Sequence, residues 1–215
     1  MREPYPGYDV LAKRWSPSWN DATRRAVDAR LSVHPGPRFL SPEAFATLQA
    51  LCERILPQPD RAAPIPLAAY VDAKLLFDAR TGYRNARLPP LREAWTRGLA
   101  ALEAEARGAY VRAFTDLDPS SQDRLIAEMK AGGLRDPAWG DMPCRLFFSE
   151  RVMAEIPRAY YAHPAAWSEI GFGGPASPRG YVRMEFDRRD PWEAAEAGAG
   201  GQAKAERENR RVGRR

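Results

Sequence analysis

The chain has 215 residues, 44% of them hydrophobic and 28% charged, which is typical of a soluble globular protein of one domain and excludes a disordered chain. Its 20 prolines and 16 glycines indicate long irregular connections between helices. The net charge of +5 does not indicate nucleic-acid binding, because six basic and two acidic residues lie between Lys204 and Arg215 and the rest of the chain carries only +1.

Residues 1–38 are predicted to form an extended arm with one short helix. Asn20 is a suitable N-cap for a helix over residues 21–31. The arm carries Trp15 and Trp19 but no strong hydrophobic period, so it is expected to lie on the body of the protein or on a partner. The apolar face of its helix is expected to consist of Ala22, Ala26, and Ala29 or Arg30.

Residues 39–192 are predicted to form one helical domain. Serine or aspartate caps, helix-initiating prolines and apolar residues at helical spacing mark an irregular all-α bundle of about five helices. Pro157 is expected to kink or end the last helix. Gly98 and Gly108 lie within the longest helix and are expected to permit close packing. The helices are expected over residues 42–56, 66–77, 91–114, 119–130 and 141–156.

A long wrapped segment, residues 160–192, follows these helices. Its first part alternates large aromatic residues with Gly and Pro, which is too apolar for a solvated loop and too interrupted for a helix or a central strand. These rings are expected either to fold back over the core or to contact a partner. Val182, Met184 and Phe186 alternate with charged residues, a pattern typical of a strand that needs another strand to pair with.

The charged run 187–192 ends in Trp192 and is either a solvated loop or an interface anchor, since Trp, Tyr and Arg are enriched at binding hot spots. Residues 193–215 have the polar, basic composition of a disordered tail. Across the arm and the wrapped segment, the candidate interface residues are Trp15, Trp19, Tyr160, Tyr161, Trp167, Phe172, Tyr181, Arg188 and Trp192.

The chain has only two histidines and two cysteines, which limits the chemistry it can perform. No second ligand lies at metal spacing from His163, so a structural role is favoured over catalysis. Cys52 lies on the face of its helix that is expected to be buried. The sequence does not decide whether Cys52 forms a disulfide with Cys144. No Cys-x-x-Cys-His sequence for covalent haem is present.

The glycine-rich residues 171–174 do not match a phosphate-binding loop, because no strand precedes them and Pro175 lacks an amide donor. Glu150, Glu155 and Glu169 are expected to be solvated rather than to form an acid/base pair. The chain is therefore expected to hold no catalytic residue, metal or cofactor.

Four motifs, in this order, resemble a known family over roughly residues 38–192. They are Phe45-x-x-Leu48-x-x-Leu51-Cys52-x-x-Ile55-Leu56-Pro57, Tyr70-Val71-Asp72, Phe114-x-x-Leu117-x-Pro119-x-x-Gln122, and the aromatic segment from Tyr160 to Tyr181. The family is that of gluconate 2-dehydrogenase subunit 3, the small subunit of membrane-linked flavin dehydrogenases.

The resemblance implies a small, cofactor-free subunit that binds, stabilises or matures a large FAD-dependent oxidoreductase of the glucose-methanol-choline type. Such a partner oxidises a sugar, a sugar acid or a glycoside, and a cytochrome c subunit often receives the electrons. Many family members begin with a twin-arginine leader. The first residues here lack the apolar core of a signal, so either the chain stays in the cytoplasm or a partner carries the export signal.

Two other functions are considered. One is a stand-alone enzyme with a pocket under residues 160–175, near His163 and Glu169. The other is a protein held at an anionic membrane surface by the basic residues 204–215. No apolar run approaches the roughly 18 residues that a membrane-spanning helix needs.

Overall fold

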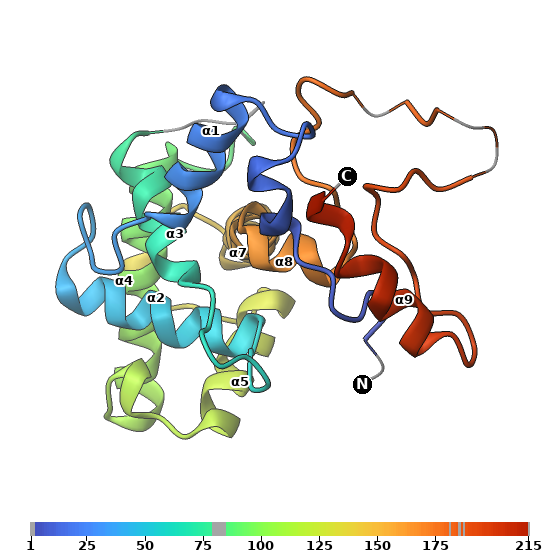
Figure 1. Cartoon of the computed structure of the whole chain (residues 1–215). Helices are drawn as coiled ribbons and strands as arrows, with labels where there is room; N and C mark the ends of the chain where they lie inside the picture. Colours follow the sequence, from blue (N-terminus) through green and yellow to red (C-terminus); the bar gives the residue numbers. More distant parts are fainter. Residues whose placement is uncertain (1–2, 79–84, 181, 185, 187, 215) are drawn as a thin grey trace. The chain divides into compact units, whose positions relative to one another are not determined.

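A computed structural model describes residues 3–78, 85–180, 182–184, 186 and 188–214 (Figure 1). All regular structure in these residues is helical, as the sequence predicts. They divide into a central unit, Val33–Tyr160, and a terminal unit, Met1–Ser32 with Tyr161–Arg215. This division differs from the expected arm, domain and tail, because both ends of the chain join in one unit.

Six helices account for most of the central unit (Figure 1). Two of them begin as predicted, since the Ser41 hydroxyl accepts a 3.2 Å hydrogen bond from the Ala44 N–H and Asp118 caps the helix that starts at Pro119. The helices are α2 (Pro42–Ile55), α3 (Leu67–Leu76), α4 (Leu91–Tyr110), α5 (Pro119–Ala131), α6 (Cys144–Phe147) and α7 (Met153–Ala162), of which the last two residues of α7 are assigned to the terminal unit.

The central core contains a close contact between α4 and the Phe147 ring. A Cβ atom at Gly98 would lie 2.4 Å from that ring, so only glycine fits there. Trp95 packs edge-on against the same ring with 5.3 Å between the centroids. The expectation of close packing is therefore confirmed at Gly98 but is wrong at Gly108, where nothing lies within 4 Å of the added atom.

Asp72 fixes the chain that enters α2. Its buried carboxylate accepts hydrogen bonds of 2.8 Å from the backbone N–H groups of Arg38 and Leu40 and of 3.2 Å from that of Phe39. Three peptide groups that no helix satisfies thus find an acceptor inside the unit. This gives the Tyr70-Val71-Asp72 motif a structural role.

Helix α4 ends four residues before the predicted position. Val111 takes a left-handed conformation (φ 58°), and the carboxylate of Glu103 accepts a 3.0 Å hydrogen bond from the Phe114 N–H. The chain turns back so that Phe114 is buried. A long-range apolar contact therefore decides the helix end, and the local pattern does not show it.

Pro157 does not end its helix, contrary to one of the two expectations. The helix widens into a π turn over Phe148–Val152 and continues as α7 through Pro157. Glu155 is buried rather than solvated, because its carboxylate pairs with the ammonium of Lys74 at 2.5 Å and with Arg158 at 3.4 Å.

The terminal unit contains α1 (Asp21–Leu31), α8 (Pro164–Glu169), α9 (Gln202–Asn209) and two 3₁₀ helices, Val10–Trp15 and Val212–Arg214. Its core combines residues from both ends of the chain: Tyr8, Val10, Trp19, Val27, Trp167, Ala194 and Val212. Figure 1 shows the start of the described N-terminal arm beside α9, where Gly7 lies close to Glu206. The buried face of α1 is Thr23 and Val27, so the face expected from its alanines is wrong.

The C-terminal residues are not a disordered tail where the structure describes them. Asn209, at the end of α9, is only 1% exposed. Its side-chain NH₂ donates to the carbonyls of Pro6 (2.9 Å) and Ala195 (3.0 Å), and its carbonyl oxygen accepts from the Ala195 N–H (2.6 Å). The tail folds because it packs on the N-terminal residues, a contact that composition does not reveal.

The segment predicted as an irregular aromatic loop is partly helical. Pro164 occupies the first position of α8, where its missing N–H costs nothing, and the Nδ1 atom of His163 accepts a 3.1 Å hydrogen bond from the Ala165 N–H. The structural role expected for His163 is confirmed. The strand expected at Val182, Met184 and Phe186 does not form among the described residues, since nothing pairs with it there.

Candidate functional site

One highly exposed aromatic residue of the terminal unit is Trp15, at the end of the first 3₁₀ helix. Its side chain is 79% exposed. The guanidinium groups of Arg14 and Arg24 lie 5.4 and 5.3 Å from its ring centroid. Such cation–π contacts reduce the freedom of the indole while leaving most of its surface open. Trp15 is therefore an exposed, partly ordered aromatic side chain, and its role as an interface residue stays a prediction.

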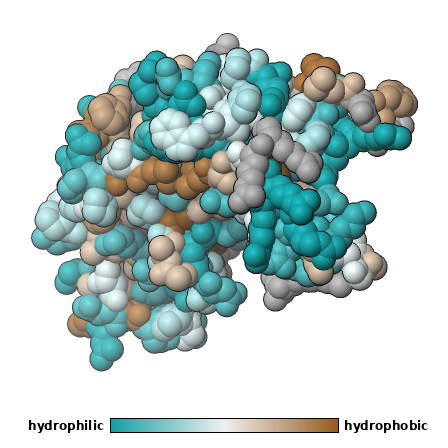
Figure 2. Space-filling model, in the orientation of Figure 1, coloured by the Kyte–Doolittle hydropathy of each residue, from teal (hydrophilic) through white to brown (hydrophobic). Residues whose placement is uncertain are grey.

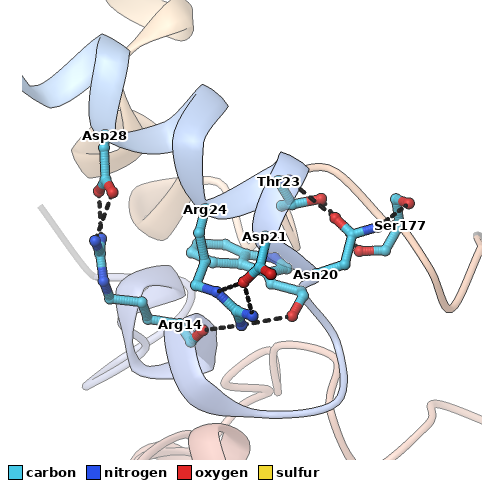
Figure 3. A network of polar contacts seen from close by, with 8 residues as sticks. Arg14, Asn20, Asp21, Thr23, Arg24, Asp28 and Ser177 are labelled. Atoms are coloured by element: carbon cyan, nitrogen blue, oxygen red, sulfur yellow. Dashed lines mark hydrogen bonds and ion pairs between the residues drawn. The ribbon is translucent and has the colours of Figure 1, made fainter.

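The two arginines beside Trp15 are held by carboxylates of α1 (Figure 3). Arg14 forms a bidentate ion pair with Asp28, in which one of the two contacts measures 2.6 Å. Arg24 forms an ion pair with Asp21 at 2.6 Å. Hydrogen bonding from Arg14 lowers the pKa of Asp28 below its ordinary value. The ion pairs fix where the positive charges stand around the indole.

Helix α1 is also tied to the C-terminal part of the unit (Figure 3). The Asn20 side-chain amide donates a 3.0 Å hydrogen bond to the Ser177 hydroxyl, and the Thr23 hydroxyl donates one of 3.1 Å to the Ser177 carbonyl. The surface around Trp15 therefore depends on contacts between segments more than 150 residues apart in the sequence.

Two of the predicted interface residues, Trp19 and Trp167, are buried in the terminal core. The Trp167 indole N–H donates a 2.6 Å hydrogen bond to the Tyr161 carbonyl, and Arg30 stacks 5.1 Å from its ring centroid. These side chains stabilise the unit itself. For Trp167, folding back over a core is the correct one of the two alternatives expected for the aromatic segment, and for Trp19 the arm lies on the protein itself.

The adjacent pair Tyr160 and Tyr161 is split between the two units. The hydroxyl of Tyr160 accepts a 3.2 Å hydrogen bond from Arg61 within the central unit. Tyr161 and Phe172 are exposed in the terminal unit, where the Phe172 ring stands edge-on to that of Trp167 at 5.6 Å. The exposed Phe172 ring is thus held in place by the buried ring of Trp167.

The remaining candidates lie between residues 181 and 192. Tyr181 lies outside the described residues. Arg188 is exposed, and the half-buried Trp192 lies under the guanidinium of Arg179, 3.7 Å from the ring centroid. The sequence indicated Trp192 as a candidate but did not indicate that Arg179 stacks on its ring.

A cleft of about 280 Å³ lies within the terminal unit. One side comes from the N-terminal arm and the other from the C-terminal part of the unit: residues 171–176, residues 179, 180, 182 and 183, and residues between 189 and 194. Its cationic walls are Lys13, Arg179, Arg183 and Arg189, its acidic walls are Asp190 and Glu193, and its aromatic walls include Trp19, Phe172 and Trp192. Residues 171–175 of the loop expected to cover an enzyme pocket line this cleft, but neither His163 nor Glu169 does.

Lys13 is the most unusual residue of this cleft, since it is only 3% exposed. Its ammonium donates a 3.5 Å hydrogen bond to the Gly173 carbonyl and lies 5.7 Å from the ring centroid of Tyr8. Burial, followed by the nearby charge of Arg179, lowers the pKa of Lys13 to about 8. Sequence analysis missed this residue because its burial arises only when the two chain ends meet.

The described residues offer no cluster of three or more His, Cys, Asp or Glu side chains suited to a metal ion. Cys52 and Cys144 are both buried free thiols, which settles the open question of a disulfide between them. No helix in the described part of the chain is both long and apolar enough to cross a bilayer.

The fold defines a small all-helical protein with exposed aromatic and apolar side chains. A family model described as gluconate 2-dehydrogenase subunit 3 matches residues 42–174, more than half of the chain, so the protein belongs to this family. No curated protein and no solved structure matches it. The resemblance in the motifs is thereby confirmed, and the family name indicates an accessory subunit that works in a complex with other dehydrogenase subunits.

Proposed function

We propose that this chain is a non-catalytic small subunit that binds and stabilises, or helps to mature, a large FAD-dependent dehydrogenase of the glucose-methanol-choline type. The large subunit holds the FAD and oxidises a sugar, a sugar acid or a glycoside. In such complexes a cytochrome c subunit often receives the electrons. Membership of the gluconate 2-dehydrogenase subunit 3 family supports a role within such a complex.

The structural observation that carries the proposal is an exposed apolar segment in the terminal unit. Val182, Met184 and Phe186 are 86%, 78% and 93% exposed. Figure 2 shows hydrophobic surface on this loop, which is drawn in orange in Figure 1. Apolar side chains of this size are costly to leave in water, and several of them exposed in one short segment are typical of surfaces that a partner protein covers.

Two further features have the composition of an interface. Trp15 is an exposed tryptophan flanked by arginines, and Arg188 is an exposed arginine close in sequence to the apolar segment. Tryptophan and arginine are over-represented among the residues that contribute most to binding. We therefore assign the contact with the flavin subunit to the terminal unit.

The test is an affinity purification of the tagged chain from its native cell, with an absorbance spectrum of the eluate. A co-eluting large subunit with flavin bands near about 370 and 450 nm is the expected result. A colourless chain that elutes alone overturns the proposed partnership.

The interface assignment is tested by replacing Val182, Met184 and Phe186 together with serine. The expected result is loss of the flavin subunit with an unchanged thermal midpoint, because these side chains are exposed. Phe77→Ser is the matched control, since Phe77 is an exposed aromatic residue of the central unit. Loss of the flavin subunit in the control alone would assign the contact to the central unit instead.

A further inference from the structure

We propose that the cleft of the terminal unit binds a carboxylate, which is held between the ammonium of Lys13 and the guanidinium of Arg179. This inference does not depend on the proposed partner. It rests on how these two cations are placed, on what they bind in the described part of the chain, and on the walls around them.

The ammonium of Lys13 has more hydrogen-bond donors than the described structure uses. An ammonium has three N–H groups. In the described residues its hydrogen bond is the long one to the Gly173 carbonyl, and it forms no ion pair there. A buried charged group without a close acceptor is costly, so a bound anion would stabilise it.

Arg179 is the second cation of the cleft. It donates a 3.1 Å hydrogen bond to the Ser18 hydroxyl and stacks on Trp192. Within the described chain it too forms no ion pair, whereas Arg183 and Arg189, which also line the cleft, bind Glu193 and Glu208. The cleft thus contains two cations that remain available to an anion.

Lys13 and Arg179 repel each other, and this repulsion contributes to the lowered pKa of Lys13, while the charge of Glu193 offsets it only in part. Like charges brought together in a partly buried site are unfavourable unless an opposite charge lies between them. A carboxylate has two oxygens, one for the ammonium and one for the guanidinium, and its hydrogen bonds with both are charge-assisted. It therefore matches the site better than a neutral ligand.

The other walls set the kind of molecule that carries the carboxylate. Trp192 and Phe172 offer flat apolar surfaces, and the space of about 280 Å³ admits a small molecule or the last side chain of a peptide. The source of the carboxylate is thus either a free small acid or the C-terminus of a protein, and the two are distinguished by experiment.

Binding is measured by calorimetry on the full-length chain with two matched pairs of probes. Benzoate is compared with benzamide, and a tripeptide ending in a free carboxylate is compared with its C-terminal amide. In each pair the shape is kept and the charge is removed. At least one acid is expected to bind ten-fold or more tightly than its amide.

The two probe pairs separate the sources. Tighter binding of the peptide acid assigns the cleft to a protein C-terminus, whereas tighter binding of benzoate assigns it to a small acid. Equal binding of acid and amide in both pairs, or no binding of any probe, overturns the proposal.

Lys13→Met is expected to reduce binding of the preferred acid at least ten-fold and to leave the thermal midpoint unchanged or higher, because it removes a buried charge. Lys204→Met is the control, because Lys204 is an exposed lysine on α9. This variant is expected to bind the acid as tightly as the wild type does. If Lys13→Met fails to fold, Gly173→Ala serves instead. Its added methyl would lie 3.0 Å from the Lys13 ammonium and displace it, so weaker binding is again expected and unchanged binding overturns the site.

The affinity is also expected to depend on pH. Lys13 titrates near pH 8 in the free protein, and a bound anion favours its charged form. Binding should therefore be strongest below that pH and weaken several-fold as the pH rises to about 9, while a carboxylate stays ionised throughout. Among the described residues, the charged and titratable groups that line the cleft or lie near Lys13 are Tyr5, Tyr8, Arg179, Arg183, Arg189, Asp190 and Glu193. An affinity that is constant over this range would contradict the role of Lys13.

Discussion

The side-chain amide of Asn209 donates a 2.9 Å hydrogen bond to the carbonyl of Pro6, which joins residues 203 positions apart. Two more hydrogen bonds link the same amide to the backbone of Ala195. One buried polar side chain thus holds together both ends of the chain, and the terminal unit exists because these ends meet.

Replacement of Asn209 by leucine should destabilise the terminal unit by about 3 kcal/mol, because it leaves several buried backbone groups without partners. Limited proteolysis should then cut the first 30 or so residues faster, as the arm is released. Arg207→Ala, an exposed change on the same helix, is the control and should leave the cleavage rate as it is. If the Asn209 variant were cleaved no faster than the wild type, the apolar contacts alone would be enough to hold the arm in place.

The two glycines inside α4 should respond oppositely to alanine. Gly98→Ala places a methyl against the Phe147 ring and should cost about 1–3 kcal/mol of stability through overpacking. Gly108→Ala meets open space and should stabilise by up to about 1 kcal/mol, because alanine favours the helix. Urea unfolding of both variants checks the signs, and an equal response would contradict the close contact at Gly98.

The carboxylate of Asp72 should be required for the stability of the central unit. In Asp72→Asn, one oxygen becomes an NH₂ group that faces backbone donors, so a loss of about 3 kcal/mol is expected. Asp123→Asn is the control, because it removes only an exposed ion pair with Arg54 and should change the unfolding midpoint little. A neutral effect at Asp72 would mean that water replaces the lost acceptor.

The central helices could be predicted because their signals are local. Ser41 with Pro42, and Asp118 with Pro119, cap and start helices within a few residues, and the apolar face of α2 follows a regular period. The end of α4 was misplaced because the hydrogen bond between Glu103 and Phe114 depends on how the chain returns. Where the local sequence pattern failed to predict a helix end, a tertiary contact determines that end.

The terminal unit was harder to predict for the same reason. Its helices are short, and its core forms between residues such as Val10 and Val212 that are nearly a whole chain apart. The aromatic residues were found from composition, but composition does not separate the buried Trp19 and Trp167 from the exposed Trp15. Lys13 gave no signal, because a lysine reveals its burial only in the folded structure.

The two cysteines should behave as buried thiols. Burial raises the pKa of the Cys52 thiol, which makes the reactive thiolate scarce. We expect no reaction of native protein with a disulfide reagent such as dithionitrobenzoate. After denaturation without a reductant, both Cys52 and Cys144 should react. An absence of free thiol in the denatured protein would reveal a disulfide and contradict the structure.

Trp15 and Trp19 should separate binding from stability. Trp19→Ala empties a site in the terminal core and should cost about 3–5 kcal/mol. Trp15→Ala removes an exposed ring, so the thermal midpoint should stay nearly constant while recovery of the flavin subunit in co-purification falls. Arg25→Ala, an exposed change on nearby α1, controls for a general loss of positive charge. Full recovery of the flavin subunit with Trp15→Ala would remove this tryptophan from the interface, and the apolar side chains at 182, 184 and 186 would then have to account for the contact.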